Sequence, residues 1–148
     1  ISPVSTEVST ELVEASVERN PHGRPVLVAD DSSVARKQVQ RALEAIGVQC
    51  VLAKDGREAL NMLLEMSKNG PIHDQIALVI SDIEMPEMDG YTFTAEIRNN
   101  PNLKDLHVIL HTSLSGVFNQ AMVQKVGANN FIAKFQPDEL AKAVQGAL

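Results

Sequence analysis

The sequence predicts an α/β domain built on a doubly wound parallel sheet, and two patterns lead to this prediction. Apolar segments of strand length alternate five times with segments that carry apolar residues at helical spacing. In addition, residues 76–80 form an unbroken apolar run. A strand with one solvent-facing side would alternate apolar and polar residues, so this run suits the centre of a parallel sheet that helices cover on both faces.

The elements are expected in a regular order from residue 25 onward. The expected strands cover residues 25–29, 48–53, 76–80, 106–112 and 130–133. The expected helices cover about 33–46, 56–66, 91–98, 116–126 and 137–147. Ser32 or Ser33 can cap the first helix and Asp55 the second, while Pro137 takes the first position of the last helix.

Five strands that alternate with five helices imply right-handed crossovers, and the flavodoxin-like strand order 2-1-3-4-5 suits this count. Residues 25–148 are therefore expected to form one domain. Residues 67–75 are long for a connection between a helix and a strand and are expected to form a surface insertion. Residues 1–24 combine four glutamates with apolar residues near helical spacing. They are expected to be a linker or an N-terminal helix from a preceding domain.

Composition argues against several kinds of partner and site. The net charge is −6 and aromatic residues make up 3% of the chain, whereas nucleic-acid binding requires a basic surface or stacking platforms. No apolar run approaches the roughly 20 residues of a membrane span, so no membrane insertion is expected. Cys50 is the only cysteine, which favours the reducing cytoplasm. His107 and His111 share a strand face without a third ligand and are expected to face helices or a partner.

Polar residues stand at four of the expected strand ends. The first strand ends at Asp30-Asp31, the third at Asp82, the fourth at Thr112 and the fifth at Lys134. In an open parallel sheet these ends lie on one edge, where ligands bind at the switch point between the first and third strands. The five residues are therefore expected to converge on one site.

The residue types at this edge point to phosphoryl chemistry. Three neighbouring carboxylates repel one another unless a cation joins them, and an all-oxygen set favours Mg²⁺, which commonly binds beside phosphate. Lys134 would add a point charge and Thr112 a hydroxyl donor, so the site could stabilise a phosphoryl group during transfer. Asp82 is the best candidate for the nucleophile, because it stands alone on the central strand while Asp30 and Asp31 can share the metal.

The same residues carry a resemblance to a known family. The motif consists of Asp30-Asp31, Asp82-x-x-Met85-Pro86-x-Met88-Asp89-Gly90, Thr112-Ser113 and Lys134. It resembles the receiver domain of two-component response regulators, from about residue 25 to the end of the chain. The run HTSLSGVFNQAMVQKVGANNFIAKF, residues 111–135, is more similar still to the receiver of CheV-type chemotaxis coupling proteins, in which a receiver follows a CheW-like domain.

The resemblance implies a signalling phosphoacceptor and not an enzyme. It implies that Asp82 accepts a phosphoryl group from a phosphohistidine on a sensor histidine kinase of the chemotaxis type. It also implies the ligands of Mg²⁺: Asp31, Asp82 and the backbone carbonyl of Glu84, with Asp30 acting largely through water.

The resemblance further implies how the phosphoryl group would switch the domain. Thr112 would move to hydrogen-bond a phosphoryl oxygen, Lys134 would pair with the group, and Phe131 would swing inward behind Thr112. The fourth helix, the fifth strand and the fifth helix would form the output surface. A preceding CheW-like domain would connect the receiver to the chemoreceptor array.

Two positions depart from the usual family pattern. Phe135 follows Lys134 where the family usually has proline, so a different loop is expected to present Lys134. Glu84 stands two residues past Asp82, beside the path of the attacking water in the family, and is expected to change the lifetime of the phosphoryl group.

Two further functions remain as alternatives. One is a Mg²⁺-dependent phosphohydrolase with an aspartyl nucleophile, since those enzymes place an acid two residues past the nucleophile, where Glu84 stands. The separate Asp30-Asp31 pair and the lack of a substrate-covering cap domain count against it. The other is a receiver that binds partners without being phosphorylated, which the intact acidic set disfavours. A flavodoxin is weaker still, because no phosphate-binding loop follows the first strand.

Overall fold

The computed structural model describes residues 23–112, 120–134 and 136–148. Within these residues, five parallel strands form one sheet in the order β2-β1-β3-β4-β5. The strands are β1 (Val26–Ala29), β2 (Cys50–Ala53), β3 (Leu78–Asp82), β4 (Val108–Thr112) and β5 (Asn130–Ala133). The predicted doubly wound architecture and its strand order are confirmed.

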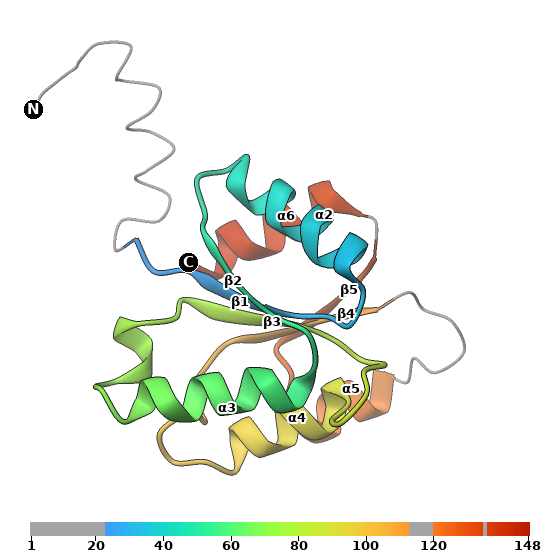
Figure 1. Cartoon of the computed structure of the whole chain (residues 1–148). Coiled ribbons are helices and arrows are strands. Elements are labelled where there is room, and N and C mark those ends of the chain that lie inside the picture. The colour runs from blue at the N-terminus through green and yellow to red at the C-terminus, as the bar shows by residue number, and fades with distance from the viewer. Residues whose placement is uncertain (1–22, 113–119, 135) are drawn as a thin grey trace, which may run out of the picture.

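Helices cover both faces of this sheet (Figure 1). They are α2 (Ser33–Glu44), α3 (Gly56–Ser67), α4 (Gly90–Arg98), α5 (Gln120–Val126) and α6 (Pro137–Ala147), with a short 3-10 helix η1 (Ile72–Asp74). Helices α2 and α6 pack together over one face, and α3, α4 and α5 cover the other. Four features expected from the sequence lie outside the described residues: the N-terminal segment up to residue 22, the helix start at residue 116, Ser113 and Phe135.

Side-chain caps start three of the helices, and the first two of these caps were expected from the sequence. The caps are Ser32 for α2, Asp55 for α3 and Asp89 for α4. In each case a side-chain oxygen accepts a hydrogen bond, 2.8 to 3.2 Å long, from the backbone N–H three residues further on. The first N–H groups of a helix have no partner within the helix, so these caps stabilise the starts that the sequence predicted.

The core has two layers, one on each face of the sheet. Val26 and Val28 of β1 point toward α2 and α6, whereas Leu27 and Ala29 point toward α3, α4 and α5. Successive side chains of a strand alternate between the faces, so a central strand that is covered twice must be apolar throughout. Strand β3 is buried along its whole length, which accounts for the apolar residues Leu78, Val79 and Ile80, whereas its last two residues, Ser81 and Asp82, are buried but polar.

The first four strands each begin one or two residues later than the sequence suggested. Strand β3 starts at Leu78 and not at Ile76, and it extends to Asp82. Strand β2 starts at Cys50 and not at Val48, because the Val48 N–H donates a 2.9 Å hydrogen bond to the Leu43 carbonyl and so closes the end of α2. Strand β4 starts at Val108 and not at residue 106.

Residues 67–75, which were expected to form a surface insertion, lie mostly at the surface, but one residue of the segment is buried. Ile72 of η1 is 2% exposed and belongs to the core layer beneath α3. The Gln75 side chain donates to the Met66 carbonyl at 2.7 Å, which joins the segment to the end of α3. One buried isoleucine therefore anchors the connection.

No helix in the described part of the chain has both the length and the apolar character needed to cross a membrane.

Candidate functional site

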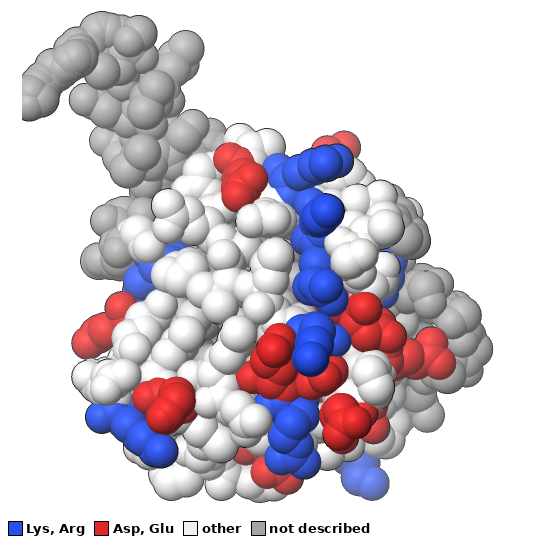
Figure 2. All heavy atoms as spheres, in the orientation of Figure 1, with Lys and Arg blue, Asp and Glu red and all other residues white. Residues whose placement is uncertain are grey.

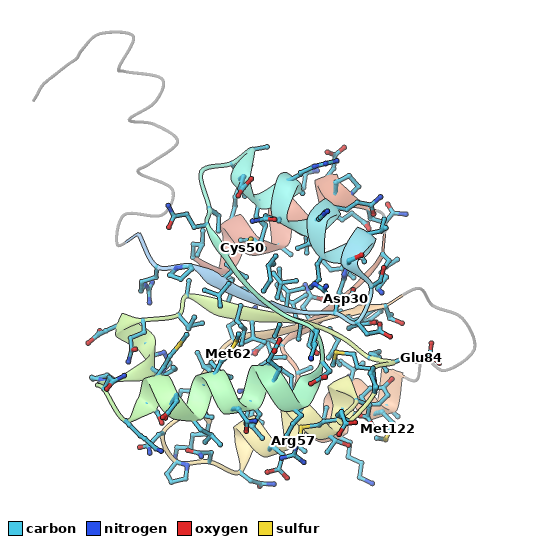
Figure 3. All side chains as sticks on the ribbon, viewed as in Figure 1. Asp30, Cys50, Arg57, Met62, Glu84 and Met122 are labelled. Atoms are coloured by element: carbon cyan, nitrogen blue, oxygen red, sulfur yellow. The ribbon has the colours of Figure 1, made fainter. Side chains whose placement is uncertain are left out.

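Residues from four strand ends meet at the carboxyl edge of the sheet. Asp30 follows β1, Asp82 ends β3, Thr112 ends β4 and Lys134 follows β5. Because the strands are parallel, these ends share one edge, and the convergence expected from the sequence is present. Figure 3 shows Asp30 and Glu84, on the loop after β3, on the same side of the molecule.

Asp30, Asp31 and Asp82 form an acidic cluster. Each offers a carboxylate oxygen, and these oxygens all lie within 4.8 Å of one another. Asp30 is fully buried and Asp82 is 5% exposed, whereas Asp31 faces solvent. The Ser32 N–H orients Asp30 through a 2.9 Å hydrogen bond to Oδ1. Figure 2 shows Asp and Glu side chains gathered on this side of the molecule.

The cluster fits a divalent cation that prefers oxygen ligands. Among the described residues, no donor makes a hydrogen bond to the buried oxygen Asp30 Oδ2, although Lys134 Nζ pairs with it electrostatically at 3.0 Å. A buried carboxylate oxygen without a hydrogen bond is unfavourable, and a cation offsets that cost. The exposed Asp31 leaves the solvent side open for water ligands, which Mg²⁺ usually keeps.

Lys134 is the cation that faces both buried acids. Its Nζ lies 3.0 Å from Asp30 Oδ2 and 3.2 Å from Asp82 Oδ2. Its backbone N–H donates a 2.6 Å hydrogen bond to the Thr112 carbonyl, which ties the end of β5 to β4. Burial lowers the pKa of Lys134, but its ion pairs with Asp30 and Asp82 outweigh burial and raise the pKa overall. The ammonium group is therefore charged at neutral pH.

Asp82 has the most perturbed carboxyl group of the cluster. Burial, together with the charge of Asp30, raises the pKa of Asp82 to about 6 against the opposing effects of Lys134 and the Ile83 N–H. That N–H donates to Asp82 Oδ1 at 2.8 Å, while Oδ2 faces Lys134. At neutral pH Asp82 is thus an ionised carboxylate with little hydration, a state that favours contact with cations and electrophiles.

The loop after β3 is held tightly against its own strand. The Gly90 N–H donates a 2.8 Å hydrogen bond to the Ile83 carbonyl, and a Cβ at Gly90 would overlap the carbonyl oxygen of Asp82. Only glycine allows this close approach. Glu84 is exposed on the same loop and lines a shallow hollow beside the acidic cluster. The hollow is lined by Asp31, Ile83, Glu84, Met85, Asp89 and Tyr91.

Thr112 and Phe131 lie on the face of the sheet that α4 and α5 cover. Thr112 is 2% exposed, and the half-buried Phe131 packs against the core layer on this face. Phe131 is in register with Leu110, two residues before Thr112, so Phe131 lies behind Thr112. This is the arrangement that the family resemblance implies, whereas the movement of either side chain stays a prediction.

His111 is a buried polar residue to which the sequence assigned no role. It is 4% exposed and lies beneath α2 and α6, which is one of the two expected positions. Burial, with the nearby charge of Lys134, lowers the pKa of His111 to about 4 against the opposing charge of Asp30, so the imidazole is neutral at pH 7. Its spacing of two residues from the inward-facing Ile109 is the sequence signal that indicates this burial.

Comparison with known proteins agrees with this geometry. Residues 26–145 match the response regulator receiver domain family. The chain is 31% identical over 120 residues to the chemotaxis protein CheV1 of Helicobacter pylori, covering 81% of the chain and 36% of that protein. It is 32% identical over 130 residues to protein PilG of Pseudomonas aeruginosa, covering 87% of the chain and 90% of PilG. The chain therefore spans well under half the length of the CheV1 relative.

Solved structures share the fold at similar identity. The chemotaxis protein CheY4 of Vibrio cholerae superposes with a TM-score of 0.70 at 29% identity, covering 84% of the chain and 98% of CheY4. The receiver domain of a signal transduction histidine kinase from Syntrophus aciditrophicus gives a TM-score of 0.73 at 32% identity, covering 84% and 89%. The family match covers most of the chain, and the acids, the lysine and the threonine lie at one edge of the sheet. The chain therefore belongs to the response regulator receiver family of two-component signalling.

Proposed function

We propose that this receiver is a phosphoacceptor in which Asp82 takes a phosphoryl group from a phosphohistidine of a histidine kinase. The observation that carries the proposal is the position of the Asp82 carboxylate. It is buried at the end of the central strand, 3.2 Å from the Lys134 ammonium group and beside two further acids. This arrangement supplies a nucleophile, a cation and metal ligands around one point.

The transfer exchanges one bond to phosphorus for another. A carboxylate oxygen of Asp82 attacks phosphorus, a P–O bond forms, and the P–N bond of the phosphohistidine breaks, with its electron pair leaving on the imidazole. The Ile83 N–H occupies Oδ1, so Oδ2, which faces Lys134, is the candidate nucleophilic oxygen. Lys134 is then within reach of the oxygens of the incoming group and offsets their charge.

The acidic cluster would hold Mg²⁺ during this step. We expect the ligands to be Asp31, Asp82 and the backbone carbonyl of Glu84, with Asp30 acting largely through water. When bound, Mg²⁺ neutralises the carboxylates and the phosphoryl oxygens, which would otherwise repel each other. Chelation is therefore expected to stop phosphorylation.

Thr112 and Phe131 are the proposed switch residues. Thr112 is expected to hydrogen-bond a phosphoryl oxygen, and Phe131 behind it, which is half-buried, is expected to swing inward. Because Phe131 belongs to β5, its movement would change the surface formed by α5, β5 and α6. We propose this surface as the one that partners recognise after phosphorylation.

We further propose a chemotaxis context. The likeness to CheV1 supports a receiver, residues 25–148, that follows a CheW-like domain through a linker or helix at residues 1–24 and thereby joins a chemoreceptor array. The chain is also 38% identical over 109 residues to the sensor histidine kinase CheAY of Helicobacter pylori, covering 73% of the chain and 13% of that protein. A chemotaxis-type kinase in the cytoplasm is the proposed phosphodonor.

A Mg²⁺-dependent phosphohydrolase is the second candidate. The exposed Glu84 in the hollow beside the acidic cluster is the observation that favours it, because an acid there could activate water. The two functions differ in turnover. A phosphoacceptor is modified once, whereas a hydrolase releases phosphate from many substrate molecules.

Phosphorylation should be measured by intact mass after incubation with acetyl phosphate, with Mg²⁺ and with EDTA. We expect the wild type and Asp74→Ala, an exposed aspartate of η1, to gain one phosphoryl group with Mg²⁺ only. Asp82→Ala should gain none. Equal labelling of Asp82→Ala would refute the assignment of the acceptor.

The same protein then separates the two candidate functions. Rapid multiple-turnover hydrolysis of p-nitrophenyl phosphate, lost in Glu84→Ala, would favour the hydrolase. If the protein is a receiver, Glu84→Ala should instead change only the decay rate of the phosphorylated protein. Equal decay rates in the wild type and Glu84→Ala would show that Glu84 has no effect on the lifetime of the phosphoryl group. Phosphotransfer from a purified chemotaxis histidine kinase would test the proposed donor.

A further inference from the structure

A cavity of about 470 Å³ lies between α2 and α6, on the face of the sheet opposite α3, α4 and α5. Its walls are mostly apolar, with Ala35, Val39 and Ala42 of α2 and Pro137 and Leu140 of α6. The polar residues Gln38, Arg41 and Gln136 also line it. Small-molecule sites usually enclose roughly 300–1,000 Å³ and are lined mostly by apolar side chains. The α2–α6 cavity has both properties.

His111 supplies a buried polar group that also lines this cavity. It is 4% exposed, yet no hydrogen bond joins its imidazole ring to any of the residues that the structure describes. Strand alternation places it there, since Ile109, two residues earlier, lies in the core layer beneath α2 and α6. A polar group in the wall of a cavity can take its hydrogen-bonding partner from water or from a ligand, so this ring offers one polar contact to a molecule in the cavity.

The charges around the cavity restrict what that partner can be. The described lining residues include one cation, Arg41, and no carboxylate, which disfavours a positively charged ligand. Figure 2 shows Lys and Arg side chains over the region of α2, in agreement with this. The imidazole ring of His111 can donate a hydrogen bond through an N–H group and accept one at its other nitrogen. A matching ligand has an apolar body and one hydrogen-bonding group.

We propose that the α2–α6 cavity binds small uncharged aromatic molecules that carry one N–H or O–H group, with the ring between Val39 and Leu140 and the polar group on His111. The cavity adjoins the acidic cluster, because His111 is in register with Asp82 on the neighbouring strand, but the cavity lining contains none of the acids and the inference does not depend on phosphorylation of Asp82.

Indole and 1-methylindole are the probes that test this site, because they differ only in the N–H group. Titrations followed by amide NMR shifts should show saturable changes confined to α2, the end of β4 and the start of α6. We expect a Kd for indole of about 1 mM or lower. 1-Methylindole should bind about tenfold more weakly, since it leaves the imidazole unpaired.

Two variants keep the proposal falsifiable. His111→Leu should remove the preference for indole over 1-methylindole. Ala42→Trp should fill the cavity and abolish binding of both, whereas Lys37→Trp, on the exposed side of α2 and outside the cavity lining, should leave both affinities unchanged.

Absence of saturable shifts with indole, equal affinities for the two probes, or a preference that survives in His111→Leu would each overturn the proposal. If Ala42→Trp does not fold, the His111→Leu comparison still decides.

Discussion

Replacing Asp82 by asparagine is expected to stabilise the metal-free protein at neutral pH. The folded state raises the pKa of this carboxyl group from 3.8 to about 6, so ionised Asp82 is less favourable in the folded than in the unfolded chain. A shift of about two units corresponds to roughly 3 kcal/mol. Asparagine also loses the ion pair with Lys134, so we expect a net gain of about 1–3 kcal/mol in the free energy of unfolding.

The sign of the pH dependence follows from the raised pKa. Below pH 3.8 both states hold the proton and Asp82 costs nothing. Between pH 3.8 and about 6 the unfolded chain releases its proton first, so the stability of the wild type falls as pH rises. Above that range the penalty is complete. The advantage of Asp82→Asn should therefore be absent in acid and fully developed at neutral pH.

Urea unfolding in EDTA, at about pH 7.5 and about pH 4, measures this difference. The matched control is Asp31→Asn, which removes an exposed carboxylate of the same cluster and should change stability by no more than about 0.5 kcal/mol. The reasoning is refuted if Asp82→Asn is no more stable than the wild type at neutral pH. A gain of equal size at both pH values would refute it as well, because the carboxylate charge would then not be its source.

Two further predictions concern the packing around the site and the single thiol. Gly90→Ala should lose at least about 2 kcal/mol in urea unfolding, because its Cβ would overlap the Asp82 carbonyl oxygen. Gly146→Ala, where a Cβ meets nothing within 4 Å, should be neutral or stabilising, and equal midpoints for the two variants would contradict the close approach. Burial, with the charge of Glu44, raises the pKa of Cys50 to about 12, so iodoacetamide should react slowly with the folded protein and quickly in urea. Equal rates, read by mass, would show that the thiol is not protected.

The site residues could be predicted from the sequence because the argument needs only strand ends. Once five apolar segments alternate with helices, the carboxyl ends of the strands must share an edge, and Asp82 and Lys134 must approach each other although 52 positions separate them (134 − 82). The caps at Ser32 and Asp55 could be predicted for a similar reason, since each depends on residues three positions apart.

Other features depend on contacts between distant segments, so local pattern could not supply them. The burial of Ile72 follows from how η1 packs beneath α3, whereas the sequence shows only a long connection with one isoleucine.

By itself, the sequence determined the doubly wound sheet, the convergence of Asp30, Asp31, Asp82 and Lys134, and the preference for an oxygen-binding cation. Periodicity and residue chemistry are sufficient for these conclusions. Only the tertiary structure decided that one ammonium group faces two buried carboxylates at 3.0 and 3.2 Å, and that α2 and α6 leave a cavity over a neutral His111. Distances, desolvation and cavities arise where side chains from separate elements meet, and no local pattern in the chain specifies them.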